Sequence, residues 1–264
     1  MIPHSVRMSS FRLVTEITEP EISALVHPDW LEAFQWLSQG TTTRASANAP
    51  PFDLGLFGEC SNPNEARGRW SVLQHQLGAQ RIVHAQQVHG AAVCTHDEDL
   101  DGTEGLTLVD PCDGHVTATP GLLLAVTTAD CVPVFMIDPQ RRAVAVLHAG
   151  WRGAAAGVIE AGLEQMTKAF SSQAEHLHVH MGPAICGTCY EVGPEVFVAL
   201  QQAAPDAPMT IDLRHVLAER AVWCGVNQAA VTISTHCTKC TQSDLFSHRE
   251  GNGERQVGYI GIKK

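Results

Sequence analysis

The chain has 264 residues, with 17 lysines and arginines against 28 aspartates and glutamates, and a formal net charge of −11. An acidic chain lacks the broad basic surface that phosphate backbones and anionic membranes require, so we exclude nucleic acid and membranes as partners. Hydrophobic residues make up 44% of the chain and charged residues 17%, which excludes the disordered and fibrous classes.

The cysteine and histidine counts point to a compartment and to a type of chemistry. Nine cysteines in a chain of this size do not match a small secreted disulfide framework, which is shorter and denser in cysteine. The start of the chain has no apolar stretch of the kind found in a signal peptide. We therefore expect a cytoplasmic protein with reduced thiols. The 14 histidines indicate metal binding or acid–base chemistry.

Hydrophobic periodicity predicts the elements along the chain. Apolar positions four apart, such as Val158, Gly162 and Met166, are typical of a helix face, whereas unbroken β-branched runs are typical of buried strands. In chain order we predict an ordered loop over 45–63, a helix over 65–77, a strand over 81–88, an acidic loop over 97–105, strands over 122–127, 132–137 and 143–147, a helix over 154–170, a strand over 176–180, helices over 193–202 and 213–228, and strands over 231–234 and 256–262.

The order of these elements predicts the fold class. Residues 138–142 form a turn short enough to join the strands on either side of it as a hairpin. A mixed α/β (α+β) fold, with a mixed sheet covered by helices, therefore fits better than a doubly wound parallel sheet. No repeat, charge block or proline-rich linker divides the sequence, so we expect a single domain over 1–264. We also expect a monomer, because no long exposed apolar stripe is evident.

Three polar residues stand where apolar strands end. His89 follows the run 82–88, Cys131 follows 122–127, and His148 ends 143–147. Because strand ends of one sheet share an edge, the three side chains are able to converge. Two imidazoles and a thiolate suit zinc or copper, and three protein ligands leave a fourth position open for water, as in catalytic sites. Their spacing matches no compact metal motif, so surface or core roles for each residue remain open here.

Several loop residues are candidates for binding an anion. The glycines of 148–153 lie between a strand and a helix, where backbone N–H groups and the helix N-terminus favour negative charge. Arg152 in the same segment is suited to phosphate or carboxylate. Arg44 and Arg249 are further loop arginines. Each of these also has a plain alternative as a turn residue or a solvated charge.

The same residues allow a second chemistry. A Cys131 thiolate activated by the His148 imidazole is the pair found in cysteine hydrolases and deamidases. A zinc deaminase pattern of H-x-E followed by P-C-x-x-C is matched only superficially by His96, Glu98 and the segment 183–189. The proline there is not next to the first cysteine, so we do not adopt that fold.

Two further Cys-x-x-Cys segments lie late in the chain, at Cys186 and Cys189 and at Cys237 and Cys240. Two such pairs are how a tetrahedral sulfur site for zinc is usually made. Their separation is much longer than in a zinc ribbon. A second, structural metal, packed core thiols and a disulfide therefore remain alternatives.

Five groups of motifs, in the order in which they occur along the chain, resemble one family. The sequence resembles the YfiH-like proteins, which have been called multicopper polyphenol oxidases or laccase-domain proteins and later purine nucleoside phosphorylases. The resemblance covers about 40–262, which leaves 1–39 as an N-terminal extension with the first strands. The matching segments are 87–90 (Gln-Val-His-Gly), 128–133 (Thr-Ala-Asp-Cys-Val-Pro), 148–153 (His-Ala-Gly-Trp-Arg-Gly), 182–185 with 189–193, and 237–238 with 246–247.

The resemblance implies a fold and a set of activities. It implies a four-layer α/β/β/α domain, shared with the deamidase domain of cytotoxic necrotising factor toxins. It implies a zinc ion on the residues that here are His89, Cys131 and His148, with copper as the alternative metal. The implied reactions are phosphorolysis of adenosine, inosine and methylthioadenosine, and adenosine deamination. Some members are instead amidases that edit peptidoglycan precursors. Copper-dependent polyphenol oxidation ranks last, because it needs several copper centres.

On this basis we expect a nucleoside and phosphate as small-molecule partners. Cys131, His148 and His89 would be catalytic, with Asp130 as a proton relay or as a residue that orients a ligand histidine. The expected substrate-binding residues are Arg44, Gln87, Arg152 and Arg249. Departures from the family pattern at 45–48, 52–55 and 246–250 bear on substrate preference and phosphate affinity rather than on the metal ligands.

Overall fold

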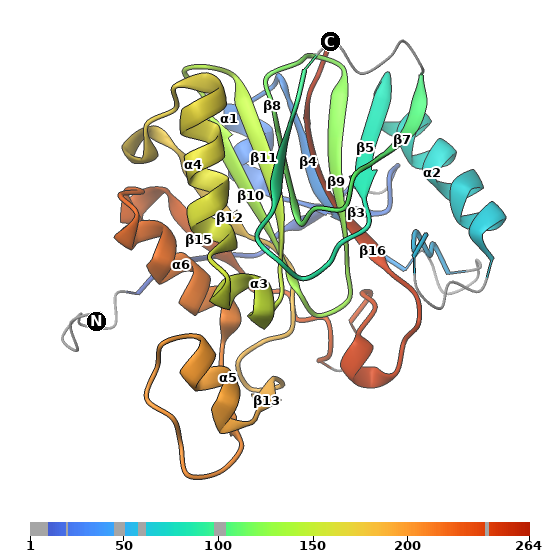
Figure 1. The fold of residues 1–264 in the computed structure, drawn as a ribbon. Coiled ribbons are helices and arrows are strands. Elements are labelled where there is room, and N and C mark those ends of the chain that lie inside the picture. Colours follow the sequence, from blue (N-terminus) through green and yellow to red (C-terminus); the bar gives the residue numbers. More distant parts are fainter. Residues whose placement is uncertain (1–9, 20, 45–50, 58–61, 98–103, 241–242) are drawn as a thin grey trace.

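The computed structural model describes residues 10–19, 21–44, 51–57, 62–97, 104–240 and 243–264 (Figure 1). The described residues form two large sheets of seven strands each. In order across the first sheet lie β1 (Arg12–Val14), β15 (Val231–Ser234), β12 (His178–Met181), β10 (Val132–Asp138), β11 (Ala143–Ala149), β8 (Gly114–Thr117) and β6 (Val93–His96). Across the second lie β2 (Ile17–Glu19), β3 (Ala24–Val26), β4 (Leu37–Thr42), β16 (Gln256–Ile262), β9 (Leu122–Thr128), β5 (Arg81–Ala85) and β7 (Gly105–Val109).

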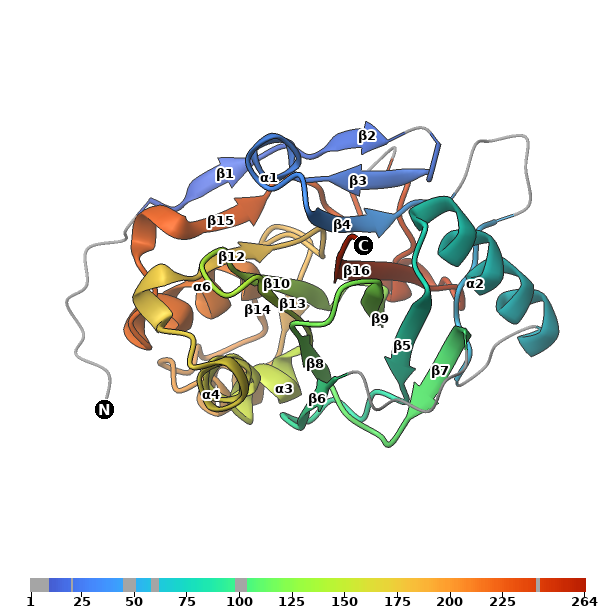
Figure 2. The ribbon, with the colours of Figure 1, turned by 90° about the horizontal axis from the view of Figure 1, so that it is seen from above.

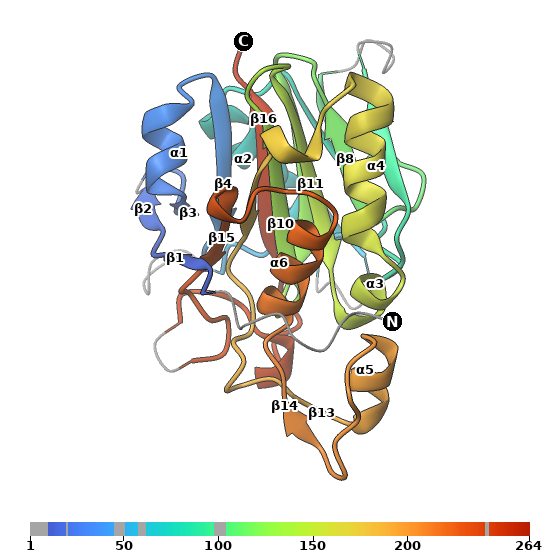
Figure 3. The ribbon, with the colours of Figure 1, turned by 90° about the vertical axis from the view of Figure 1, so that its left-hand side faces the viewer.

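Helices cover the outer faces of the two sheets. Figures 1 and 2 show α4 on one side of the sheets and α2 on the other. Figure 3 shows α4 and α6 along the same side. The helices are α1 (Pro28–Ala33), α2 (Pro63–Leu77), α3 (Trp151–Ala155), α4 (Val158–Phe170), α5 (Pro194–Ala199) and α6 (Leu213–Trp223). A small ribbon of β13 (Glu191–Val192) and β14 (Met209–Thr210) lies near α5, away from the main sheets.

Alternation along the strands explains this layering. In β9, Leu124 and Val126 pack between the sheets, while Leu123 and Ala125 pack outward with residues of α2. Phe135 of β10 shares the layer between the sheets, whereas its neighbours on the strand pack outward under α4 and α6. Successive side chains of a strand point to opposite faces, so each buried strand contributes to two cores. The mixed α/β class and the predicted four layers are thereby confirmed.

Several predicted elements are confirmed with small shifts in their ends. The hairpin forms, with β10 and β11 antiparallel across the turn 139–142. The predicted helix over 65–77 is α2, which begins earlier because Asn62 caps it and Pro63 occupies its first turn. It ends at Gly78, whose φ of 61° lies in the left-handed region.

Other predicted elements are wrong in their extent. The helix predicted over 154–170 is two helices, α3 and α4, because Gly157 has a φ of 87° between them. The helix predicted over 213–228 stops at Trp223, shortly before Gly225 (φ 100°), and that over 193–202 is the short α5. The strand predicted over 81–88 ends at Ala85, and that over 176–180 begins only at His178.

For the N-terminal part, the sequence predicts first strands within 1–39 but not their bounds or their partners. β1 joins the first sheet, whereas β2 and β3 join the second. Residues 45–50 and 58–61 of the predicted loop, and 98–103 of the predicted acidic loop, lie outside the described residues, and so does Glu98 of the deaminase pattern. Within the described part of the chain, no helix is both long and apolar enough to cross a membrane.

Candidate functional site

The structure brings the three predicted metal ligands together. Cys131 stands directly before β10, and His148 lies in β11, where it pairs with Pro133 across the hairpin. His89 comes from the loop that follows β5. One ligand atom from each of the three side chains lies within 4.8 Å of the others. The imidazoles of His89 and His148 meet edge to face, with 4.8 Å between ring centroids.

A carboxylate that the sequence analysis missed organises this group. Asp113 is fully buried, and its Oδ1 accepts a 2.9 Å hydrogen bond from His148 Nδ1. The same carboxylate accepts hydrogen bonds from the backbone N–H groups of Val88, His89 and Gly90, at 3.2, 2.9 and 2.7 Å. One side chain therefore positions both histidines.

Local structure explains why Asp113 lies there. It precedes β8, and Gly114 of β8 pairs with Leu147 of β11, which places Asp113 beside His148. His89 has a φ of 59°, a conformation that costs free energy in a non-glycine residue, and the three N–H groups around Asp113 hold it. Burial raises the pKa of the Asp113 carboxyl. The hydrogen bonds from His148 and Gly90 outweigh burial and lower that pKa below its usual value.

Two glycines let the backbone pack closely against the residues of this group. A Cβ at position 150 would lie 3.0 Å from Cys131 Sγ and 3.3 Å from His89 Cδ2. A Cβ at Gly153 would lie 2.9 Å from the backbone oxygen of Gly90, in the loop that carries His89. The close approach explains the glycines of segment 148–153. The helix that follows, α3, has only five residues, so the predicted anion site at its N-terminus has little helix dipole behind it.

The electrostatics favour an ionised cysteine. Burial raises the pKa of the Cys131 thiol, but His148, and to a lesser extent His89, lower it to about 6 through charge and hydrogen bonds. Burial lowers the pKa of His148, but the Cys131 thiolate and the Asp113 carboxylate raise it to about 9. In the metal-free protein at neutral pH, the pair is therefore a thiolate and an imidazolium.

These residues fit a metal ion. Asp113 engages Nδ1 of His148, which leaves Nε2 on the Cys131 side of the ring as the nitrogen for a metal, as is usual for a metal-ligating histidine. A thiolate and two imidazoles are borderline-soft donors that suit zinc and copper. Three protein ligands, fewer than the four of a closed structural site, match a catalytic site.

Asp130 contacts the loops rather than the histidines. Its Oδ1 accepts a 2.5 Å hydrogen bond from Thr238 Oγ1, and its Oδ2 accepts a 2.7 Å bond from the Arg249 backbone N–H. Its φ of 84° lies in the left-handed region. The predicted role of orienting a ligand histidine therefore belongs to Asp113. Asp130 instead joins two late loops to the segment that carries Cys131.

Gln87 and Arg44 also bind their own chain. Gln87 pairs with Thr127 at the end of β9, donating through Nε2 to its carbonyl at 2.8 Å and accepting from its backbone N–H at 2.7 Å. The loop that carries His89 is thereby fixed to β9. Arg44 donates to the Leu245 carbonyl at 2.8 Å and lies over the ring of Phe246. Both predicted substrate-binding residues thus position loops in the structure.

Arg249 and Arg152 lie near a tyrosine close to the site. The Arg249 guanidinium lies 5.2 Å from the Tyr190 ring centroid and donates to the Glu191 carbonyl at 2.9 Å. Arg152 is exposed and lies over Trp151. Burial raises the pKa of Tyr190 to about 12, the charge of Cys131 adds to this, and both arginines oppose it. Tyr190 stands in the motif 189–193, the signal that could have singled it out.

Comparisons with known proteins identify a family and several named relatives. A family model described as multi-copper polyphenol oxidoreductase laccase matches residues 40–263. A purine nucleoside phosphorylase of Mycobacterium bovis is 36% identical over 223 residues, which cover 79% of this chain and 85% of that protein. Adenosine deaminase RL5, from an unknown prokaryotic organism, is 35% identical over 194 residues, which cover 67% of this chain and 74% of that protein.

Solved structures show the same fold. The hypothetical protein YfiH of Bacillus licheniformis matches with a TM-score of 0.80 and 25% identity, covering 91% of this chain and 97% of that one. YlmD of Geobacillus stearothermophilus matches with a TM-score of 0.78 and 25% identity, covering 88% and 93%.

Proposed function

Because this chain belongs to the multi-copper polyphenol oxidoreductase laccase family, which includes the YfiH-like proteins, we propose that it is a zinc-dependent purine nucleoside phosphorylase with adenosine deaminase activity. The family resemblance seen in the motifs is confirmed. Relatives named purine nucleoside phosphorylase and adenosine deaminase support an enzyme of this kind. The observation that carries the proposal is the group of His89, Cys131 and His148, oriented by Asp113.

Each side chain of the group has a defined task in this proposal. His89, Cys131 and His148 would hold the metal, and a zinc ion there supplies Lewis-acid chemistry for phosphorolysis and hydrolytic deamination. Asp113 fixes the ring of His148 and the backbone of His89. Cys131, with its pKa lowered to about 6, provides a thiolate ligand at neutral pH. One set of three donors does not supply the several centres that laccase chemistry needs, so copper remains the less favoured metal.

The arginines divide into two tasks. Arg249 and Arg152, which lie near Tyr190, would bind the phosphate that attacks the ribose. Arg44 and Gln87 would act as positioning residues for the loops that carry Arg249 and His89. Adenosine, inosine and methylthioadenosine are the proposed nucleosides, and we propose a cytoplasmic monomer with these small molecules as its partners.

A second candidate function has a specific observation in its favour. Cys131, His148 and Asp113 form a chain of thiolate, imidazolium and carboxylate, the arrangement of a cysteine hydrolase. Cys131 would attack an amide carbonyl, and His148 would protonate the departing amine. An amidase that edits peptidoglycan precursors is therefore the alternative.

One experiment distinguishes the two activities. The purified protein is incubated with inosine, with and without phosphate, and separately with a UDP-muramoyl peptide. We expect phosphate-dependent release of hypoxanthine and ribose-1-phosphate. Amide cleavage without nucleoside turnover would support the alternative instead.

A further inference from the structure

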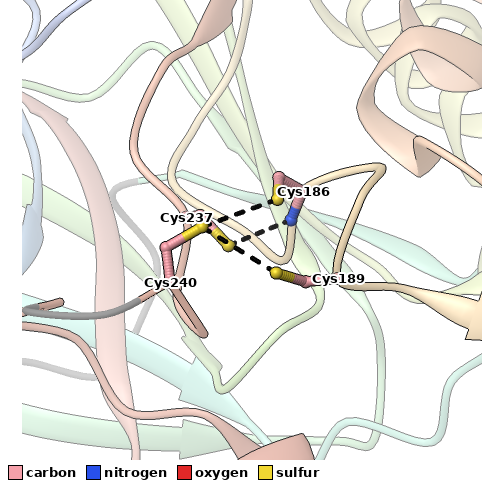
Figure 4. A group of neighbouring side chains, drawn as sticks. All are labelled: Cys186, Cys189, Cys237 and Cys240. Atoms are coloured by element: carbon pink, nitrogen blue, oxygen red, sulfur yellow. Dashed lines mark hydrogen bonds between the residues drawn. The ribbon is translucent and has the colours of Figure 1, made fainter.

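Four cysteines from two distant segments meet outside the site already described. Cys186 and Cys189 lie on the loop after β12, and Cys237 and Cys240 lie on the loop after β15 (Figure 4). One sulfur from each lies within 4.8 Å of the others. Cys240 Sγ is 3.8 Å from Cys186 Sγ and 3.8 Å from Cys189 Sγ. The deaminase pattern considered for this segment is therefore not formed, because its cysteines face two other cysteines.

We propose that Cys186, Cys189, Cys237 and Cys240 bind a structural zinc ion, a second metal site separate from the one in the proposed function. A tetrahedral zinc ion with Zn–S bonds of about 2.3 Å keeps its sulfurs about 3.8 Å apart. The separations of Cys240 Sγ from Cys186 Sγ and Cys189 Sγ match that sulfur–sulfur distance. Four thiolates leave no open coordination position, which is the mark of a structural site rather than a catalytic one.

The backbone around the sulfurs is arranged to receive a metal. Cys237 Sγ accepts hydrogen bonds from the backbone N–H groups of Cys186, at 3.3 Å, and Lys239, at 3.4 Å. Hydrogen bonds of this kind hold a ligand sulfur in a fixed position. An isolated bridge between Ala184 and Cys237 holds the two loops in register.

Two contacts tie these loops to the start of α6 before any metal binds. A Cβ at Gly187 would lie 2.8 Å from the Asp212 side chain, so the first cysteine loop packs directly on the start of α6. Arg214 donates to the carbonyls of Ser234 and His236, at 2.9 and 3.2 Å, immediately before the second cysteine pair. A preformed arrangement of this kind lowers the entropy cost of binding.

Packed core thiols explain this cluster less well. Cys237 is buried, but Cys186 and Cys189 are only half-buried and Cys240 is exposed. Cys240, the most exposed of the four, nonetheless has the sulfur atoms of Cys186 and Cys189 at 3.8 Å, a grouping that core packing does not explain. Zinc binding displaces the protons that the thiols carry, which pass to water, and it requires no oxidant.

A zinc ion on the four cysteines would also affect the site around Cys131. Thr238, between the cysteines of the second pair, and Arg249, farther along the same loop, both bind Asp130 next to Cys131. Ile185, directly before Cys186, donates its backbone N–H to the Asp130 carbonyl at 3.1 Å. A zinc ion on the four cysteines would therefore fasten both loops that contact Asp130.

The test measures metal content per chain in freshly purified, reduced protein. Wild type is compared with Cys131→Ser, with the double variant Cys186→Ser/Cys240→Ser, and with Cys224→Ser as a matched control. Cys224 is a half-buried cysteine at the end of α6, outside both groups. We expect the double variant to hold one equivalent of zinc less than wild type, Cys131→Ser to keep the equivalent bound by the four cysteines, and Cys224→Ser to match wild type. Equal zinc content in wild type and the double variant would overturn the proposal.

A second measurement does not depend on the double variant folding. Cys131→Ser protein is stripped of metal and titrated with Co²⁺ under reducing conditions. We expect one equivalent of Co²⁺ to bind with an intense thiolate-to-cobalt charge-transfer band. Absence of that band, or a disulfide among the four cysteines in peptide mass mapping of unreduced protein, would refute the site. Failure of the nucleoside assay would leave this result unchanged, so the two proposals fail separately.

Discussion

The carboxylate of Asp113 accepts a hydrogen bond from Nδ1 of His148 at 2.9 Å, and both groups are almost completely buried. The same carboxylate binds the backbone of the loop that carries His89. The two imidazoles of the candidate metal site therefore depend on one side chain, although they come from a loop and a strand far apart in the sequence.

The first prediction concerns this carboxylate. Asp113→Asn removes the charge that stabilises His148 and weakens the contacts to the loop that carries His89. The affinity for zinc should therefore fall by about 10–100-fold, and the activity should fall with it. Competition titration with a zinc chelator measures the affinity. The control is Asp110→Asn, an exposed acidic residue three positions earlier. Wild-type zinc affinity in Asp113→Asn would show that the carboxylate does not position the ligands.

The second prediction concerns space at the site. Gly150→Ala places a Cβ 3.0 Å from Cys131 Sγ, while its φ of −81° suits any residue. Zinc affinity and activity should therefore fall with little change in the melting temperature. Gly68→Ala is the matched control, because Gly68 lies in the middle of α2 with nothing within 4 Å of an added Cβ. That control should keep full activity and gain up to about 1 kcal/mol of stability. An unfolded Gly150→Ala protein would contradict the prediction.

The sequence places His89, Cys131 and His148 at strand ends, and the family resemblance implies that they form one ligand set, but neither indicates the carboxylate behind them. His89, Cys131 and His148 follow long apolar runs, and the ends of such runs are visible without a structure. Asp113 precedes a strand of only four residues, Gly114–Thr117, and becomes a partner of His148 only through the pairing of β8 with β11. Sheet pairing between distant segments has no local signal.

The fold class follows from the buried strands and the hairpin, but element ends do not. Gly157 interrupts a continuous apolar pattern, so periodicity alone predicts one helix where there are two. The strand predicted over 81–88 extends beyond β5, which ends at Ala85, because Gln87 pairs with Thr127 through its side chain rather than its backbone. Arg44 likewise resembles an anion-binding loop residue, yet its guanidinium contacts the chain itself.

The third prediction concerns pH in the metal-free protein. The pKa of Cys131, about 6, lies below its ordinary value of 9.0, so its contribution to stability is lost as the pH falls through 6. The pKa of His148, about 9, lies above its ordinary value of 6.5, so its contribution is lost as the pH rises through 9. The attraction acts between the Cys131 thiolate and the His148 imidazolium, so both must be charged. It therefore stabilises the folded state between about pH 6 and pH 9.

This prediction is checked by the alkylation rate of Cys131 with iodoacetamide in chelator-treated protein, followed by peptide mass mapping. The rate should rise with a midpoint near pH 6, because only the thiolate reacts. In His148→Asn the midpoint should move toward the ordinary thiol value of 9.0. An unchanged midpoint in that variant would show that His148 does not ionise Cys131.

The last prediction uses Arg249 to separate phosphorolysis from deamination. Its backbone N–H binds Asp130 and is unaffected by substitution, whereas its guanidinium lies over Tyr190. In Arg249→Gln, one charge-assisted contact to phosphate is lost, which corresponds to about 1.5–3 kcal/mol, or a KM for phosphate about 10–100-fold higher. Deamination of adenosine uses no phosphate and should change much less. Arg67→Gln, on the exposed face of α2, is the control.

Comparing the two assays on the same preparation distinguishes phosphate binding from loop positioning. If Arg249 binds phosphate, the loss appears in the KM for phosphate, and raising the phosphate concentration restores the rate of phosphorolysis. If the guanidinium serves only to hold the Glu191 carbonyl, phosphorolysis and deamination fall together and phosphate does not restore either. The second pattern would move Arg249 from the substrate-binding residues to the positioning residues, beside Arg44.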